Sequence, residues 1–128
     1  MSVKELRANG MMAHLLDALD EGKDIGHYGR LVFAMVAQHF MDDRELLRWL
    51  RKDRSVDEEE VKALVQQVRE RGYSPPRRER ILAWQQQQEF PIVPNPDDPD
   101  AANVYRDLQF PDEVYERIEE YHEQKAEV

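Results

Sequence analysis

The chain has 128 residues, of which 18 are basic and 27 acidic, and its formal net charge is −9. That length favours one folded unit with a core of its own, and a hydrophobic fraction of 41% is too high for a chain that is disordered throughout. The net charge disfavours broad wrapping of nucleic acid or docking on an anionic membrane, because phosphate groups would repel most of the surface.

Helical periodicity dominates the N-terminal third of the chain. Asn9 is expected to cap a first amphipathic helix, which Gly22 ends. Asp24 should cap residues 25–40, the most apolar segment, whose middle is hydrophobic on nearly all sides, as in a helix surrounded by others. Within it, a stripe of small residues and one phenylalanine would let another helix approach closely. The stripe consists of Gly26, Gly29, Phe33 and Ala37.

Three further helices are expected, each opened by a polar residue that accepts a hydrogen bond from the first helical turn. The caps and ranges are Asp42 for residues 44–52, Ser55 for residues 58–71 and Ser74 for residues 75–90. Gly72 should end the second of these helices, and Pro75 should take the first helical position of the third.

Residues 91–100, here called the strap, are rich in proline and aspartate. Each residue before a proline is pushed out of the helical region, so the strap is expected to be extended. Phe90, Ile92 and Val93 are its candidate anchors, which either fill pockets on the bundle or lie open as a contact surface. A strap held against the bundle is the interpretation we favour.

After the strap, Asp100 is expected to cap a short helix over residues 101–108, and Pro111 should open an acidic C-terminal helix. That helix carries an apolar stripe able to dock on the bundle. The stripe consists of Val114, Ile118 and Tyr121.

The predicted fold class is therefore all-α: a compact bundle of five to six helices with an extended proline-rich strap before the C-terminal helix. We expect a single helical domain over residues 1–128, with a helical core (1–90), the strap (91–100), and a short helix plus an acidic C-terminal helix (101–128). The longest apolar run, residues 31–37, is far shorter than the roughly 20 residues that span a bilayer. A cytoplasmic protein without a membrane partner is expected.

Five arginines cluster between two of the predicted helices, against two glutamates. They are Arg69, Arg71, Arg77, Arg78 and Arg80. Their order along a helix, a tight turn and the next helix matches a helix-turn-helix, which would present guanidinium groups to phosphates. The pattern departs from that motif near Arg78, where a buried apolar residue is expected. The alternatives are pairing with the acidic residues of 95–128 and recognition of an external acidic surface.

Residue types for catalysis and metal binding are sparse. The chain has no cysteine, no threonine and only three serines, which excludes thiol chemistry and disulfides, and it has no glycine-rich phosphate loop. Glu119 and His122 have the spacing of carboxylate-bridged di-iron helices, but a second such pair is missing. His14 and His39 are expected to be hydrogen-bonded core residues. No catalytic, cofactor-binding or metal-binding residue is assigned, and no enzymatic activity is expected.

The sequence thus predicts a small acidic protein-interaction or regulatory module without catalytic activity. Its expected partner is another protein, and a homodimer is also expected. The first alternative is a helix-turn-helix-like nucleic-acid binder that uses the arginine cluster. The second is a helical protein that binds a metal through carboxylates and histidine.

Overall fold

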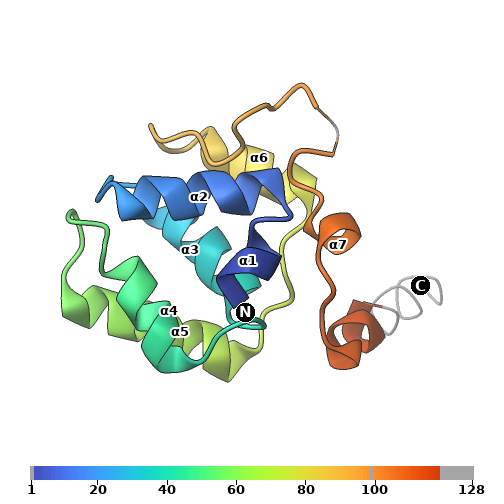
Figure 1. Cartoon of the computed structure of the whole chain (residues 1–128), viewed down its shortest axis with the longest axis horizontal. Coiled ribbons are helices and arrows are strands. Elements are labelled where there is room, and N and C mark those ends of the chain that lie inside the picture. The colour runs from blue at the N-terminus through green and yellow to red at the C-terminus, as the bar shows by residue number, and fades with distance from the viewer. Residues whose placement is uncertain (1, 99, 119–128) are drawn as a thin grey trace.

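The computed structural model describes residues 2–98 and 100–118. This part of the chain contains eight helices, six of which have seven residues or more, and no strand. The helices are α1 (Ser2–Leu6), α2 (Gly10–Asp20), α3 (Gly26–Ala37), α4 (Asp43–Leu50), α5 (Glu58–Arg71), α6 (Arg78–Gln85) and α7 (Val104–Asp107), followed by residues 112–118 (Figure 1). The predicted all-α bundle is confirmed. None of the described helices is long and apolar enough to cross a membrane.

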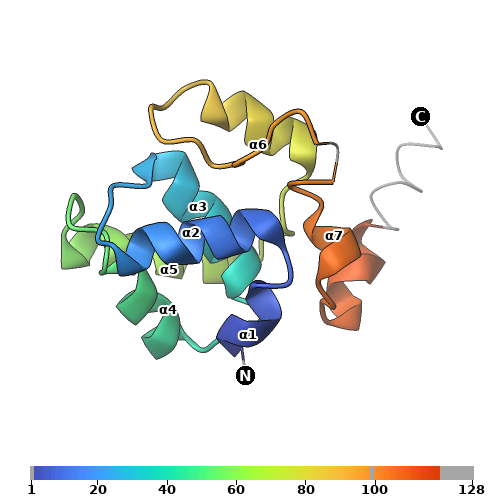
Figure 2. The ribbon, with the colours of Figure 1, turned by 45° about the horizontal axis from the view of Figure 1, so that its top comes forward.

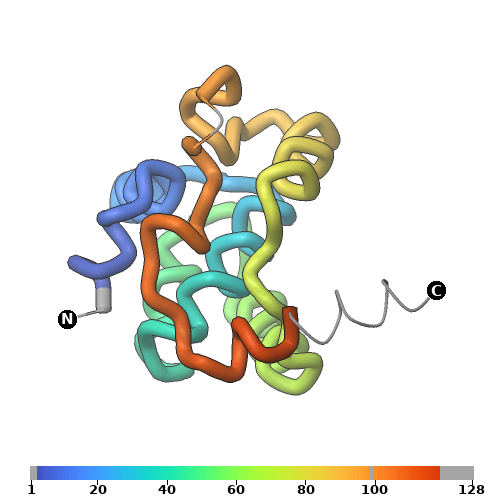
Figure 3. Tube along the Cα trace, turned by 90° about the vertical axis from the view of Figure 1, so that its right-hand side faces the viewer, coloured from blue at the N-terminus to red at the C-terminus, as the bar shows by residue number. Residues whose placement is uncertain are grey.

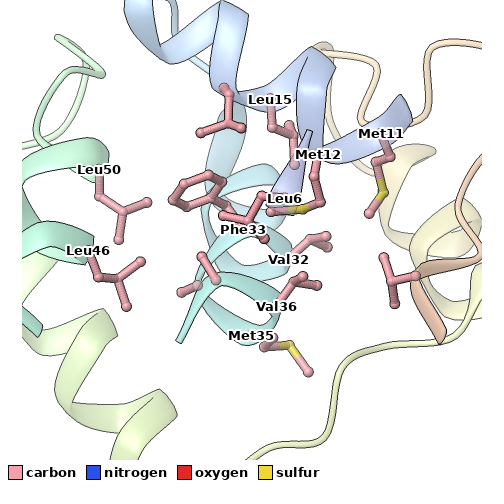
Figure 4. Packing of buried hydrophobic residues seen from close by; sticks show 14 of the residues in the cluster. Leu6, Met11, Met12, Leu15, Val32, Phe33, Met35, Val36, Leu46 and Leu50 are labelled. Atoms are coloured by element: carbon pink, nitrogen blue, oxygen red, sulfur yellow. The ribbon is translucent and has the colours of Figure 1, made fainter. Parts of the chain in front are cut away.

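Helix α3 lies at the centre of the bundle, as its hydrophobic sequence predicts. It packs against α2, α4, α5 and α6, and the run from Val32 to Ala37 is buried. Figure 4 shows Phe33 projecting from α3 toward Leu46 and Leu50 of α4, with Leu15 of α2 nearby. A helix with neighbours on most sides exposes little of its surface to solvent. This is why the segment carries so few charged residues.

The small-residue stripe of α3 is covered by the protein's own chain. A Cβ on Gly26, whose φ is +77°, would lie 2.4–2.6 Å from the side-chain amide of Gln88. A Cβ on Gly29 would lie 3.2 Å from the Cβ of Ile25. The stripe therefore accommodates a glutamine side chain and an isoleucine, and it no longer supports the expected homodimer.

Two of the predicted helix caps are confirmed. Asn9 Oδ1 accepts a hydrogen bond of 3.0 Å from the amide of Met12, and Asp42 Oδ1 accepts one of 2.9 Å from the amide of Glu45. Gly72 ends α5 in the left-handed conformation with φ of +56°, where a glycine is favoured.

Other predicted caps are wrong by a few residues. Asp57, rather than Ser55, caps α5, and Asn103, rather than Asp100, caps α7. Helix α3 has Ile25 at its N-cap position, which offers no side-chain acceptor. Asp24 instead accepts from the amide of Gly26 over 2.8 Å. In each case several polar residues stand before the helix, and the sequence pattern favoured the wrong one.

Helix α6 is shorter than the predicted range of residues 75–90. It begins at Arg78, because the residues before Pro75 and Pro76 are disfavoured in the helical region. Residues 73–77, here called the linker, run from α5 to α6 without helical structure (Figure 3), so the expected tight turn is wrong. Both linker prolines are buried.

The strap runs beside α6 (Figure 2) and contains turns in place of the continuous extension that was expected. The amide of Asp98, for example, donates to the carbonyl of Asn95 over 3.1 Å. Ile92 and Val93 are buried in the core, and Phe90 is half-buried and stacked on His14 at 5.2 Å. These side chains therefore lie against the bundle, while residues 94–98 face solvent.

The segment that follows the strap returns to the other end of the bundle. Phe110 is buried, and its ring contacts those of His39 at 5.6 Å, Phe40 at 5.5 Å and Tyr105 at 5.4 Å. Val114 is buried as well. Tyr121, the last member of the predicted stripe, lies outside the described residues.

Candidate functional site

An open groove of about 1120 Å³ lies between α3, α5, α6 and the segment from α7 to residue 118. Its walls carry apolar and aromatic side chains from four separate parts of the chain. Among them are Leu31, Met35, Ala83, Trp84, Tyr105 and Ile118. The lining residues range from Leu31 to Ile118 along the chain, so the groove exists only in the folded protein.

The linker forms one side of the groove and separates α5 from α6. The C-terminal part of the chain contacts the middle of the linker and the residue before it: the Tyr105 hydroxyl donates to the carbonyl of Pro75, and Arg117 Nη1 donates to the carbonyl of Gly72. Burial raises the pKa of Tyr105 to about 12, so its hydroxyl stays protonated and remains a donor near neutral pH. In Figure 3 the red end of the described C-terminal segment lies next to the point where the linker leaves α5.

An ordered aromatic wall stands on the α6 side of the groove. The Trp84 ring stacks on Tyr28 of α3, with centroids 5.6 Å apart and ring planes at 16°. The Tyr28 hydroxyl donates to Gln87 Oε1 over 3.2 Å, and the guanidinium of Arg80 lies 5.8 Å from the Trp84 ring. Such contacts restrict the rotamers of the aromatic side chains, which lowers the entropy cost of binding against them.

The charged side chains that line the groove are mostly positive. Of the residues that the structure describes, Arg77, Arg80 and Arg117 line it, against one carboxylate, Glu79. This balance is opposite in sign to the net charge of −9 carried by the whole chain. The groove is thus a positive concave surface on an acidic protein, a distribution that attracts anionic groups locally.

The five clustered arginines do not form one surface in the structure. Arg69 is used internally, since it donates to Asp43 and to the carbonyls at positions 38 and 41. Arg78 Nη2 donates to the carbonyl of Pro96 over 2.7 Å and so holds the strap. Arg71 is exposed at the end of α5, and only Arg77 and Arg80 reach the groove.

This division changes the basis of the helix-turn-helix hypothesis. Helix α6, which would be the recognition helix, packs on α3 and follows a non-helical linker in place of a tight turn. Arg78 in its first turn is bonded to the strap. The helix-turn-helix motif requires a buried apolar residue near position 78. This chain has an arginine there, and its side chain binds the strap.

The described residues hold no group of three or more histidine, aspartate or glutamate side chains placed to bind a metal ion. Glu119 and His122, which carry the metal hypothesis, lie outside the described part of the chain. His39 is half-buried next to Phe110, and no hydrogen-bond partner reaches its Nε2 within the described residues.

Sequence reasoning missed most residues of the groove. Arg80 and Trp84 are four residues apart on a predicted helix, and that spacing is a usable signal for a shared face. Arg117 and Tyr105 carry no such signal, because they reach the groove only through the return of the C-terminal segment. Comparison with protein families, curated proteins and solved structures found no match.

Proposed function

We propose that this protein is a non-catalytic interaction module whose groove binds an acidic segment of a partner protein, one that also carries apolar or aromatic side chains. The observation that carries the proposal is the combination of lining residues. Three arginines border a floor of aliphatic and aromatic side chains, on a protein that is otherwise strongly acidic.

The shape of the groove favours a peptide segment over a small molecule. Pockets for small ligands enclose roughly 300–1,000 Å³ and bury most of the ligand surface. This groove, of about 1120 Å³, is larger than that range and only partly enclosed. Apolar side chains of a bound segment would contact Leu31, Ala83 and Trp84, and their burial would supply most of the affinity.

The arginines supply the preference for acidic segments. A guanidinium group presents its N–H donors as a planar fork that matches a carboxylate, and Arg80 is exposed at the groove. The negative charge elsewhere on the protein opposes this attraction only weakly. At physiological ionic strength the Debye length is about 8 Å, so distant charges are screened and those in contact are not.

The proposal is tested by fluorescence anisotropy with short labelled peptides that alternate glutamate with leucine and phenylalanine. Two matched peptides replace either the glutamates by glutamine or the apolar residues by serine. We expect both replacements, and the Arg80→Glu variant of the protein, to weaken binding about tenfold or more, because each removes one of the two contacts. A labelled single-stranded oligonucleotide serves as a further probe.

Arg44→Glu provides the control, because Arg44 is exposed on α4, outside the groove, and its replacement changes the net charge equally. Thermal melting of both variants verifies that they fold. Equal loss of binding in Arg44→Glu and Arg80→Glu would contradict a site in the groove. Tighter binding of the oligonucleotide than of the acidic peptide would favour the nucleic-acid alternative.

A further inference from the structure

The described chain ends at the groove itself. Arg117 and Ile118, its last two residues, both line the groove, and residues 119–128 follow them directly in the sequence. Their sequence, EEYHEQKAEV, contains four glutamates against one lysine, together with a tyrosine and a valine. This composition is that of the acidic, partly apolar segment for which the groove is suited.

We infer that residues 119–128 bind in the groove of their own chain and compete there with the partner segment, so that the groove is autoinhibited. The inference rests on the proposed function and concerns the regulation of that same site. Among the described residues that line the groove, three are arginines and one, Glu79, is acidic, so the net charge of the lining is opposite in sign to that of residues 119–128.

Covalent attachment makes even a weak contact effective. A segment tethered by a short linker has an effective concentration in the millimolar range. An intrinsic dissociation constant of roughly 0.1–0.2 mM would then reduce the apparent affinity for an external segment about five- to tenfold, since only the open fraction of the protein can bind it. Ten residues span at most about 35 Å when extended, which bounds how far from Ile118 the contact can lie.

The first test measures binding of the acidic–apolar peptide to the full chain with Glu119, Glu120 and Glu123 replaced by glutamine. We expect binding to become about five- to tenfold tighter, because the competing segment loses its charge contacts. The matched control replaces Glu21, Glu59 and Glu89 by glutamine; all three are exposed and none lines the groove. An equal gain in both variants would show a general effect of net charge and would overturn the inference.

The second test detects the intrachain contact directly, without any peptide. Carbodiimide cross-linking of the Arg80→Lys variant should join position 80 to a glutamate among residues 119–123, as mapped by mass spectrometry. The Arg44→Lys variant, with its lysine outside the groove, should give no such link. In an equal mixture of labelled and unlabelled protein, links between two copies in place of links within one copy would overturn the inference.

The two proposals fail in different ways. If the peptide binds in an Arg80-dependent manner but the tail variant gains nothing and no link forms, autoinhibition is wrong and the proposed function stands. If the peptide binds neither the parent protein nor the tail variant, the proposed function is wrong, and the regulatory inference falls with it.

Discussion

At the scale of single residues, the carboxylate of Asp53 is the most constrained polar group in the core. It is fully buried and accepts hydrogen bonds from the amide of Ile25 (3.1 Å), from Arg30 Nη1 (2.9 Å) and from the amide and hydroxyl of Ser55. Burial by itself would raise the pKa of Asp53, but these hydrogen bonds outweigh it and hold the pKa below its ordinary value. The ion pair thus joins the loop after α4 to the start of α3.

Replacing Asp53 by alanine is expected to lower the free energy of unfolding by about 3–5 kcal/mol, because the amide of Ile25 loses its acceptor and the largely buried Arg30 keeps only a longer pair with the exposed Asp24, at 3.4 Å. Urea-induced unfolding measures this loss. Asp20→Ala is the control, since the Asp20–Lys52 pair is exposed and should contribute less than about 1 kcal/mol. Similar losses in the two variants would contradict a special role for Asp53.

His39 gives the protein a predicted pH dependence. Burial, and then the nearby charges of Arg69 and Arg117, lower the pKa of His39, while Glu113 acts in the opposite direction. Above pH 6.5 the imidazole is neutral in the folded and unfolded states. As the pH falls below 6.5, the unfolded chain takes up the proton first, so the free energy of unfolding decreases until the folded-state pKa is reached.

The melting temperature should therefore drop on going from above to below pH 6.5, and the His39→Phe variant should show a smaller drop. Phenylalanine retains a ring against Phe110 and removes the titrating group. His27→Phe is the matched control, because it makes the same substitution at an exposed histidine. An identical drop in the parent and His39→Phe proteins would assign the effect to other groups.

At the scale of helices and loops, Gln88 supplies the cap that α3 lacks locally. Its Oε1 accepts from the amide of Tyr28 in the first turn of α3 (2.9 Å), while its Nε2 donates to the carbonyls of Ile25 (2.9 Å) and Phe90 (3.0 Å). The side chain of Gln88 thus binds backbone groups both at the start of α3 and at Phe90, directly before the strap. Gln88 and Tyr28 are 60 residues apart in the sequence.

Gln88→Ala should lower the free energy of unfolding by about 1–3 kcal/mol, because partly buried backbone groups lose their partners. Gln86→Ala, at an exposed neighbouring position, should change it by less than about 0.5 kcal/mol. Both are measured by urea unfolding, and hydrogen exchange of the Tyr28 amide reports on the cap itself. Unchanged protection of that amide in Gln88→Ala would show that the cap is dispensable.

The strap is held by its apolar residues. Ile92 is fully buried, so Ile92→Ala should lower the free energy of unfolding by about 2–4 kcal/mol, the range for truncating a buried aliphatic side chain. Asn95→Ala, in the exposed part of the strap, should have little effect. A melting curve for Ile92→Ala that matches the parent protein would instead point to a strap that contributes little to the core.

At the scale of the whole molecule, self-association stays a prediction, but the small-residue stripe of α3 no longer supports it. The glycines of α3 are occupied internally, and the remaining support is the half-buried aromatic surface at Trp49 and Trp84. A net charge of −9 opposes contact between copies, so dimers should increase as added salt screens the repulsion. Sedimentation at roughly tens of micromolar protein measures this, and a monomer at every salt concentration would contradict it.

Local sequence signals determined the helical class, the central position of α3 and the ends set by Asn9, Asp42 and Gly72. These features depend on hydrophobic periodicity and on hydrogen bonds within a single turn, which involve residues close together in the chain. The burial of Ile92 also follows from its apolar character beside a bundle.

The tertiary structure alone decided which arginines face the groove and which are used inside the protein. Arg69 and Arg78 are bound to loop carbonyls 18–31 residues away along the chain. The groove itself depends on Tyr105 and Arg117 returning to the linker. Each of these contacts joins residues that are distant in sequence, and their position depends on how the buried apolar faces of several helices pack together, which no local pattern encodes.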